Sequence, residues 1–341
     1  MERREKRAAE TVEISVVIPT FEGGHRLPAT LEALGRCTQP PQGAEIVVVD
    51  DGSPEPVVLP DGPAPLPCPL RLLRLASNAG RAAACNAGVR AASGRVVLIL
   101  DDDMSAAENL LEVHRRAHPP ASAPRAVVGR IDPDPEFFTG PFGRFLAAEE
   151  ERRHQRLAAR DRTLNFTDCL TGHFSVPRSA LLEIGGYDEG FSRYGFEDIE
   201  LAFRLERAGV ELVYTEATVT RHRSEFADFA AHCRRHLEAG AMARHFVERH
   251  HLPEIEAFLR TGGMPWNEQQ GGFRKAMGAA HTLIRTLPAP LRPPLLALAR
   301  TTVRVAEWIA PTALLHAGYH IVRDMHYAAG MAAEAEARGH G

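Results

Sequence analysis

Three apolar runs rich in β-branched residues, each ending at proline or aspartate, constrain the fold of this chain most. They are ISVVIP (14–19), EIVVVD (45–50) and RVVLILD (95–101). A run that is apolar at almost every position is typical of a strand buried on both faces, as in a parallel sheet covered by helices. Helical stretches near 26–36 and 81–92 separate the runs, and LRLLRL (70–75) is a further strand candidate. This alternation predicts an α/β fold with a mostly parallel, Rossmann-like sheet flanked by helices.

The chain of 341 residues is long enough for two domains. We expect a disordered tail over 1–12, a catalytic domain over 13–223 whose nucleotide half ends near 103 and whose acceptor half follows, and a helical C-terminal region over 224–341. Seven prolines between 54 and 69 predict a stiff surface connection. Ser105 and Glu108 have the spacing of a capping box, which predicts that a helix starts there.

Composition narrows the function class. A net charge of −4 gives no general signal for nucleic-acid binding. The five cysteines are odd in number and never form C-x-x-C, which favours a reducing compartment over a disulfide framework. The charged N-terminus lacks the apolar stretch of a signal peptide, so we expect a cytoplasmic protein. Its 38 arginines against two lysines are typical of a GC-rich bacterial genome.

Acidic residues follow two of the apolar runs, at the strand ends where open α/β sheets bind ligands. Asp50 and Asp51 could accept hydrogen bonds from a nucleobase imide or a ribose hydroxyl, and an ordinary Asp-Gly turn is the alternative. Asp101 and Asp103 are alternate residues of an acidic triplet and can point to one side. Their carboxylates suit Mg²⁺ or Mn²⁺, and a charged loop before a helix is the alternative.

Two later positions are further candidates. Glu197 and Asp198 open a helical stretch beside aromatic residues, where a carboxylate could serve as general base toward a sugar hydroxyl. Simple capping of the helix N-terminus explains them equally well. His222 lies at the end of a predicted strand and gains a functional role only if the fold brings it near Asp103.

Taken together and in this order, these segments resemble the family 2 glycosyltransferases of the GT-A fold. The resemblance runs from about Ile14 to His222. The segments SVVIPTFEGG, VVVDDGS, SNAGRAAACNAGVRAASGRVVLILDDDM and GGYDEGF…GFEDIELAFRL carry it. It implies a metal-dependent glycosyltransferase of the hexosyltransferase type, with a nucleotide-sugar donor and a hydroxyl acceptor. The resemblance further implies inversion at the anomeric carbon.

The resemblance assigns roles to residues of this chain. Asp198 is the expected general base, and Glu197 is expected to bind the acceptor or orient the loop. Asp101, Asp103 and His222 are the expected ligands of Mn²⁺ or Mg²⁺. The expected nucleotide-binding residues are Pro19, Thr20, Phe21, Glu22, Asp50, Asp51, Asn78, Arg81, Asp101 and Asp102. A carboxylate facing the N3–H of a pyrimidine favours a UDP-sugar, with a dTDP-sugar as the second choice.

The resemblance stops near His222, and the region beyond it is left with two interpretations. An amphipathic pattern with Arg300 and Arg304 over 293–322 fits peripheral contact with an anionic membrane at its inner face. A helical subdomain or a homodimer contact is the more ordinary interpretation.

The acceptor could be a glycan, a lipid-linked sugar or a small molecule. A sugar nucleotidyltransferase and a non-catalytic nucleotide-sugar-binding relative are the alternative functions. The first normally needs a basic glycine-rich loop, and TFEGGHRL contains no lysine.

Overall fold

The strands predicted from the apolar runs form the parallel half of an eight-stranded sheet, whose order is β3-β2-β1-β4-β7-β6-β8-β5. The computed structural model describes residues 12–38, 43–59, 68–159, 164–224, 228–253, 255 and 272–339. The parallel strands are β1 (Ile14–Thr20), β2 (Ala44–Asp50), β3 (Leu70–Arg74) and β4 (Val96–Leu100). All residues of β1, β2 and β4 are buried, which explains why their sequences are continuously apolar. The expected 1–12 tail lies outside these residues except for Val12.

The second half of the sheet is mixed. Its strands are β5 (Met104–Ala106), β6 (Arg125–Pro133), β7 (His173–Pro177) and β8 (Glu211–His222). β7 runs antiparallel to both β4 and β6, and β8 runs parallel to β6 and antiparallel to β5. β8 is the longest strand of the sheet, and His222 is its last residue. The pairing of β7 with β4 brings the acceptor half of the chain beside the nucleotide half.

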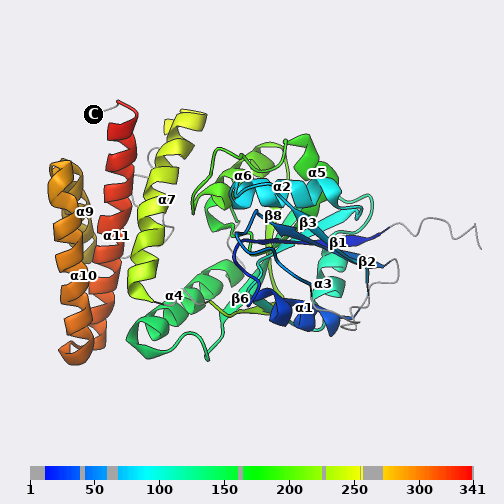
Figure 1. Cartoon of the computed structure of the whole chain (residues 1–341), viewed down its shortest axis with the longest axis horizontal. Helices are drawn as coiled ribbons and strands as arrows, with labels where there is room; N and C mark the ends of the chain where they lie inside the picture. The colour runs from blue at the N-terminus through cyan, green and yellow to red at the C-terminus, as the bar shows by residue number, and fades with distance from the viewer. Residues whose placement is uncertain are drawn as a thin grey trace, which may run out of the picture. The chain divides into compact units, whose positions relative to one another are not determined.

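Helices cover both faces of this sheet (Figure 1). α2 (Arg81–Ala91), α5 (Arg178–Glu183) and α6 (Glu197–Arg207) lie on one face, where Ala84, Val89 and Leu201 join the core. α1 (Leu27–Gly35) and α3 (Leu110–Ala117) lie on the other, with Leu31 and Leu111 in a second core. A short 3₁₀ helix, η1, spans Phe166–Asp168. The sheet is therefore the middle of three layers.

The expected helix start at Ser105 is wrong. Ser105 lies in β5 and pairs with Arg221 of β8, and α3 begins only at Leu110. The N-cap residue of α3 is Asn109, whose side chain makes no capping hydrogen bond. Pairing with a distant strand has overridden a local capping signal.

The described residues divide into two compact units. The first comprises 1–134, 150–192 and 198–223, and the second comprises 135–149, 193–197 and 224–341. Helix α4 (Gly140–Ala158) contributes residues to both units. The other helices of the second unit are α7 (Phe229–His250), α9 (Gly272–Thr286), η2 (Ala289–Leu291), α10 (Arg292–Ile309) and α11 (Thr312–Ala337).

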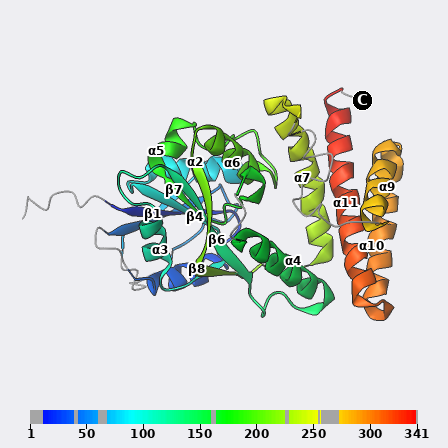
Figure 2. The same cartoon turned by 180° about the vertical axis from the view of Figure 1, so that it is seen from behind.

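Helix α11 is the centre of the second unit and packs against α7, α9 and α10 (Figure 2). α7 and α11 approach each other closely at two glycines. A Cβ atom on Gly240 would lie 2.0 Å from the carbonyl oxygen of Tyr327, and one on Gly330 would lie 1.9 Å from that of Leu237. Any larger residue at either position would push the helices apart. Within the described residues, no helix is both long enough and apolar enough to cross a bilayer.

A chain of buried histidines lies in the first unit. His114 contacts Ser175 through Nδ1 at 2.7 Å and His173 through Nε2 at 2.8 Å. The Nε2 atom of His118 lies 2.7 Å from the same Ser175 hydroxyl. Nδ1 of His173 lies 3.1 Å from the carbonyl oxygen of Arg130. Burial lowers the pKa of His118 and of His173 to about 4 and holds that of His114 well below its usual value. These rings are therefore neutral in the folded protein at pH 7.

Candidate active site

The carboxyl ends of β1, β2 and β4 bring the predicted nucleotide residues to one edge of the sheet. Thr20 is in register with Asp50 across the β1–β2 pair. Pro19 and Thr20 are buried in β1, whereas Phe21 and Glu22 lie in the exposed loop that follows. Glu22 adopts a φ of +51°, and its N–H donates to the Ser53 hydroxyl at 2.9 Å. The loop after β1 is thus fixed to the loop after β2.

Asp50 is a fully buried residue that organises this second loop. One carboxylate oxygen accepts from the N–H and hydroxyl of Ser53, at 3.0 and 2.6 Å. The other accepts from Arg74 at 2.7 Å and from the N–H of Val57 at 3.3 Å. Burial acts to raise the pKa of Asp50, but these hydrogen bonds and the Arg74 charge more than offset it, so the pKa is lowered. Its contacts are those of a turn-stabilising residue.

Asp51 connects the same loop to the start of α2. Its two carboxylate oxygens accept from the N–H groups of Ala79 and Gly80, each at 2.9 Å. Asn78 also accepts from Gly80, at 3.0 Å, so its side chain belongs to this turn. Burial raises the pKa of Asp51 in spite of the two hydrogen bonds. Asp51 therefore connects the VVVDDGS loop, of which it is part, to the segment that precedes Arg81.

The three aspartates after β4 make different contacts. Asp102 is buried, and its carboxylate accepts from the Thr20 hydroxyl at 2.5 Å and from Arg26 at 3.1 and 3.3 Å. Burial raises the pKa of Asp102, and the hydrogen bonds from Arg26 and Thr20 offset it only in part. Asp101 and Asp103 bond to other residues of the first unit, Arg81 and His222. Asp102 is thus bound to β1 and its following loop, whereas Asp101 and Asp103 bond to Arg81 and His222.

Arg81 bonds to side chains from three parts of the first unit. Its guanidinium donates to Asp101 at 2.7 Å, to Asp198 at 3.1 Å and to the Thr171 hydroxyl at 2.9 Å. Burial acts to lower the pKa of Arg81, but the Asp101 and Asp198 carboxylates more than offset it, so the pKa is well above its usual value. The cation thus joins a carboxylate of the acidic triplet to the predicted base.

Asp198 is further held by Thr171, which lies in the turn just before β7. Its carboxylate accepts from the Thr171 N–H at 3.1 Å and from the Thr171 hydroxyl. Three donor groups therefore orient this carboxylate at the start of α6. Glu197, the residue before it, is buried and belongs to the second unit. The two neighbouring acids consequently lie in different surroundings.

The donor set at Asp103 and His222 fits a hard divalent cation. Oδ2 of Asp103 lies 3.1 Å from Nε2 of His222, and Met104 pairs with His222 between β5 and β8. Adjacent ligands of an octahedral ion at about 2.1 Å are about 3 Å apart, so the two atoms match neighbouring coordination positions. Within the described residues, no three acidic, histidine or cysteine side chains group closely enough to hold a metal by themselves. Additional oxygens would have to come from a ligand.

Three residues that support the site were not identified from the sequence. Thr171 orients Asp198, Arg26 bonds to Asp102, and Asn86 holds the GGY turn. The Asn86 amide donates to the Tyr187 carbonyl at 2.9 Å, and its oxygen accepts from the Tyr187 N–H at 2.8 Å. Thr171 opens the TGHFSVP segment and Asn86 opens Asn-Ala-Gly, so each lies inside a motif. Arg26 lies in a loop without any comparable signal.

Comparison with known proteins gives a consistent result. The family model described as "Glycosyl transferase family 2" matches residues 15–185, and "N-terminal domain of galactosyltransferase" matches 151–229. An uncharacterized glycosyltransferase of Bacillus subtilis is 25% identical over 259 residues, covering 61% of this chain and 64% of its own. The validoxylamine A glucosyltransferase of Streptomyces hygroscopicus subsp. limoneus is 29% identical, covering 58% and 49%. The pre-mycofactocin glycosyltransferase of Mycobacterium tuberculosis is 27% identical, covering 74% and 52%. The chain thus spans about half to two-thirds of these relatives.

A solved structure supports the fold assignment. The mannosyltransferase PcManGT from Pyrobaculum calidifontis, in complex with GDP-Man and Mn²⁺, superposes with a TM-score of 0.57. The alignment covers 92% of this chain and 87% of that one, at 19% identity. The expected GT-A fold, with its mixed sheet, flanking helices and helical C-terminal part, is confirmed.

Proposed function

The chain belongs to glycosyl transferase family 2, and we propose that it transfers a sugar from a nucleotide-sugar donor to a hydroxyl acceptor, with inversion and with a divalent metal. The observation that carries the proposal is the hydrogen-bonded group of Arg81, Asp101 and Asp198. It joins the acidic triplet, where a donor diphosphate would bind, to the carboxylate that would receive the acceptor proton. Similar relatives are named for glucosyl transfer and for glycosylation of pre-mycofactocin.

Asp198 is the general base of this proposal. The acceptor oxygen attacks the anomeric carbon, the bond from that carbon to the diphosphate oxygen breaks, and the proton passes to Asp198. The electron pair leaves with the nucleoside diphosphate. Thr171 and Arg81 hold the carboxylate in one orientation for this step. Glu197 binds an acceptor hydroxyl or orients the loop.

Asp101, Asp103 and His222 are the proposed metal ligands. When bound with the donor, Mn²⁺ or Mg²⁺ would neutralise charge that develops on the leaving diphosphate. The Pyrobaculum protein of the same fold was solved with Mn²⁺ and a nucleotide sugar. Arg81 bonds to Asp101 in the free protein, so we expect it to exchange part of this contact for the diphosphate when the donor arrives.

The donor nucleotide of the proposal is UDP, with dTDP as the second choice. Asp51 is the better placed of the two loop aspartates for contact with the base. The carboxylate of Asp50 already accepts four hydrogen bonds in its own loop and from Arg74, whereas that of Asp51 accepts two. Thr20, Phe21 and Glu22 would line the base and ribose from the loop after β1.

Slow donor hydrolysis tests the proposed activity without knowledge of the acceptor. Purified protein is incubated with UDP-glucose, UDP-galactose, UDP-N-acetylglucosamine or dTDP-glucose, with Mn²⁺ or with EDTA, and released nucleotide is measured. We expect metal-dependent release from at least one donor, and loss of that release in Asp103→Ala. Glu206→Gln, at the far end of α6, is the matched control. The absence of release and of metal-dependent nucleotide binding with every donor would contradict the proposal.

A further inference from the structure

Five large exposed apolar side chains of the second unit lie along α10 and the η2 turn before it. Leu291, Leu298 and Val305 recur every seven residues, and Trp308 and Ile309 follow one turn later. Residues at this spacing share one face of a helix. We name these five residues the α10 stripe. From Leu291 to Ile309 the stripe is about 27 Å long at 1.5 Å per residue.

The α10 stripe lies opposite the packed side of the helix. Leu296 and Val303, on the other side of α10, are buried in cores that include residues of α11. Trp308 is 89% exposed and Ile309 is 81% exposed, the two highest values for large apolar side chains in the described part of the chain. Leu314, at the start of α11, continues the exposed surface around the corner between the two helices. Contiguous apolar exposure of this kind marks an interaction surface.

The charge around the stripe differs from that of the whole chain. Helix α10 itself contains three arginines, Arg292, Arg300 and Arg304, and one acid, Glu307, whereas the whole chain has a net charge of −4. Glu307 accepts a hydrogen bond from the Tyr319 hydroxyl at 2.6 Å. The basic residues Arg285 and Arg304 are exposed on α9 and α10. Arg292 is buried and pairs with Glu336, and Arg304 pairs with Asp228 at 3.3 Å, so the exposed cations beside the stripe are Arg285 and Arg304.

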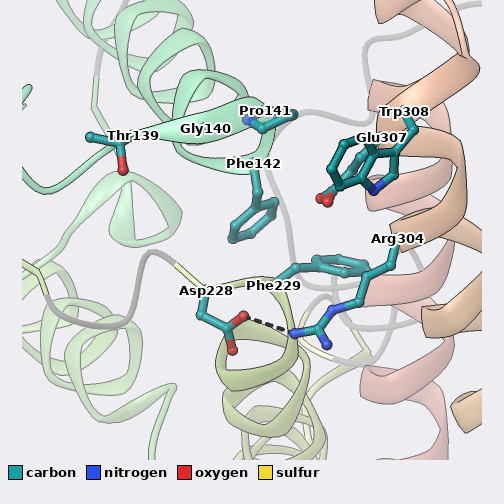
Figure 3. A pocket seen from close by; sticks show the side chains of 9 residues that line it. All are labelled: Thr139, Gly140, Pro141, Phe142, Asp228, Phe229, Arg304, Glu307 and Trp308. Carbon is teal, nitrogen blue, oxygen red and sulfur yellow. Dashed lines mark hydrogen bonds and ion pairs between the residues drawn. The ribbon is translucent and has the colours of Figure 1, made fainter.

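Figure 3 shows the end of the stripe beside a pocket of about 340 Å³. Phe142 and Phe229 line it, and Arg304 reaches across to Asp228 at 3.3 Å. Trp308 stands at its edge beside Glu307 and is not covered by these aromatic rings. The ring of Trp308 is thus fixed to a helix but open to solvent.

We propose that the α10 stripe is a docking surface for an anionic lipid bilayer, with α10 lying in the plane of the interface. Trp308, Ile309 and Leu314 would enter the boundary between headgroups and acyl chains, and Arg285 and Arg304 would lie at the level of the lipid phosphates. Amphipathic helices that lie on membranes have this combination of an apolar face, an aromatic residue and cations. This proposal does not depend on the proposed transfer activity.

Charge favours a bilayer over a second copy of the chain as the occupant. A symmetric contact between two α10 stripes would bring two cationic segments together, and like charges across an interface oppose association. The residues between the apolar ones also include Pro294 and Thr301, which are poor seam positions for a helix pair. An anionic lipid surface supplies both the apolar medium and the opposite charge.

The fluorescence of Trp308 tests the proposal directly. Trp266→Phe leaves Trp308 as the single tryptophan of the full-length chain. With vesicles containing 30% phosphatidylglycerol, we expect a blue shift of the emission and quenching by brominated acyl chains. Binding should weaken several-fold from 0.1 to 0.5 M NaCl and should be at least tenfold weaker with pure phosphatidylcholine. An emission spectrum unchanged by anionic vesicles would overturn the proposal.

Substitutions on the stripe give a second measurement. Val305→Asp with Ile309→Asp should reduce vesicle co-sedimentation at least tenfold, because both residues are exposed and become charged. Val58→Asp, at a 74% exposed valine of the first unit, should leave it unchanged. Circular dichroism checks that each variant is folded. If the stripe variant binds vesicles like the parent, or if the parent is a dimer that the variant dissociates without any vesicle binding, the bilayer is not the occupant.

Discussion

Nη1 of Arg81 lies 3.1 Å from Oδ1 of Asp198, although 116 residues separate them in the sequence. The same guanidinium bonds to Asp101 at 2.7 Å. The first residue of α2 therefore connects the strand end of β4 to the start of α6. This contact gives the proposed metal-binding carboxylate and the proposed base a shared partner, so their positions depend on each other.

Removal of the Asp198 charge should stop transfer while leaving donor binding intact. Asp198→Asn keeps the shape of the side chain but cannot accept the acceptor proton, and loss of a general base typically costs about 10²–10⁴-fold in rate. We expect kcat to fall by at least about 100-fold and nucleotide affinity, measured by calorimetry, to change by only a few-fold.

The Glu197→Gln variant distinguishes the role of Glu197 from that of Asp198. If Glu197→Gln is inactive while Asp198→Asn retains turnover, the assignment of the base is reversed. The configuration of the product, determined by NMR, is a further check, because a retained anomeric configuration would contradict direct displacement.

The metal-binding role predicts a specific loss in Asp103→Ala. The backbone contact of Asp103, in which its carbonyl accepts from the Arg223 N–H at 2.9 Å, does not need the side chain. The fold should therefore survive, with an unchanged melting temperature of the free protein. Turnover and the Mn²⁺-dependent increase in nucleotide affinity should both disappear. Asp132→Ala, which removes a partly exposed carboxylate from β6, is the control. Full turnover of the parent protein in EDTA would refute a metal requirement.

The position of Asp51 predicts discrimination between pyrimidines. A carboxylate can accept from the N3–H of uracil or thymine, whereas N3 of cytosine is itself an acceptor and would leave the carboxylate unpaired. We expect UDP and dTDP to bind at least about tenfold more tightly than CDP in the presence of Mn²⁺, with UDP the tighter of the two. Calorimetric titration of all three nucleotides measures this. Equal affinities for UDP and CDP would remove the base-recognition role from Asp51.

Strands β1, β2 and β4 were predictable because their residues are buried on both faces and mostly apolar. β7 was not, because its sequence HFSVP carries His173 and Ser175, which are polar and yet buried. Their polarity is accommodated by the histidine chain, which brings together α3, β7 and the carbonyl of Arg130. No local pattern in the sequence contains that information. The pairing of Ser105 with Arg221 is likewise a contact between segments that are distant in the sequence, and it overrode the capping box.

The candidate site was predictable as a set of residues but not as an arrangement. The motifs indicate Arg81, Asp101 and Asp198 separately. Their meeting depends on the antiparallel pairing of β7 with β4, which puts Gly172 beside Asp101 and Thr171 next to Asp198. A Cβ atom on Gly172 would lie 2.5 Å from Oδ2 of Asp101, so a larger residue there would displace the Asp101 carboxylate. Thr171 could be recognised only after this register was known.

The buried histidine chain predicts that stability falls in mild acid. The Arg130 carbonyl can only accept, so His173 donates through Nδ1 and its Nε2 must accept from Nε2–H of His114. Nδ1 of His114 then accepts from Ser175, which accepts from His118. A second proton on His173 would direct two N–H groups at each other.

The direction of the pH effect follows from the lowered pKa values. His118 and His173 have a pKa of about 4 when folded and the ordinary value of 6.5 when unfolded. The unfolded chain therefore takes up protons first as the pH falls. The stabilisation is complete above about pH 6.5 and is lost between there and pH 4, by on the order of 2 kcal/mol for each of these residues at pH 5.

Urea unfolding at pH 7.5, 6.0 and 5.0 measures this loss. In His118→Gln the amide can still donate to Ser175 but does not titrate, so the free energy of unfolding should depend less steeply on pH than in the parent. His25→Gln, at an exposed histidine of the loop before α1, should leave the slope unchanged. A free energy of unfolding that stays constant from pH 7.5 to 5.0 would mean that these buried histidines are not held neutral in the folded state.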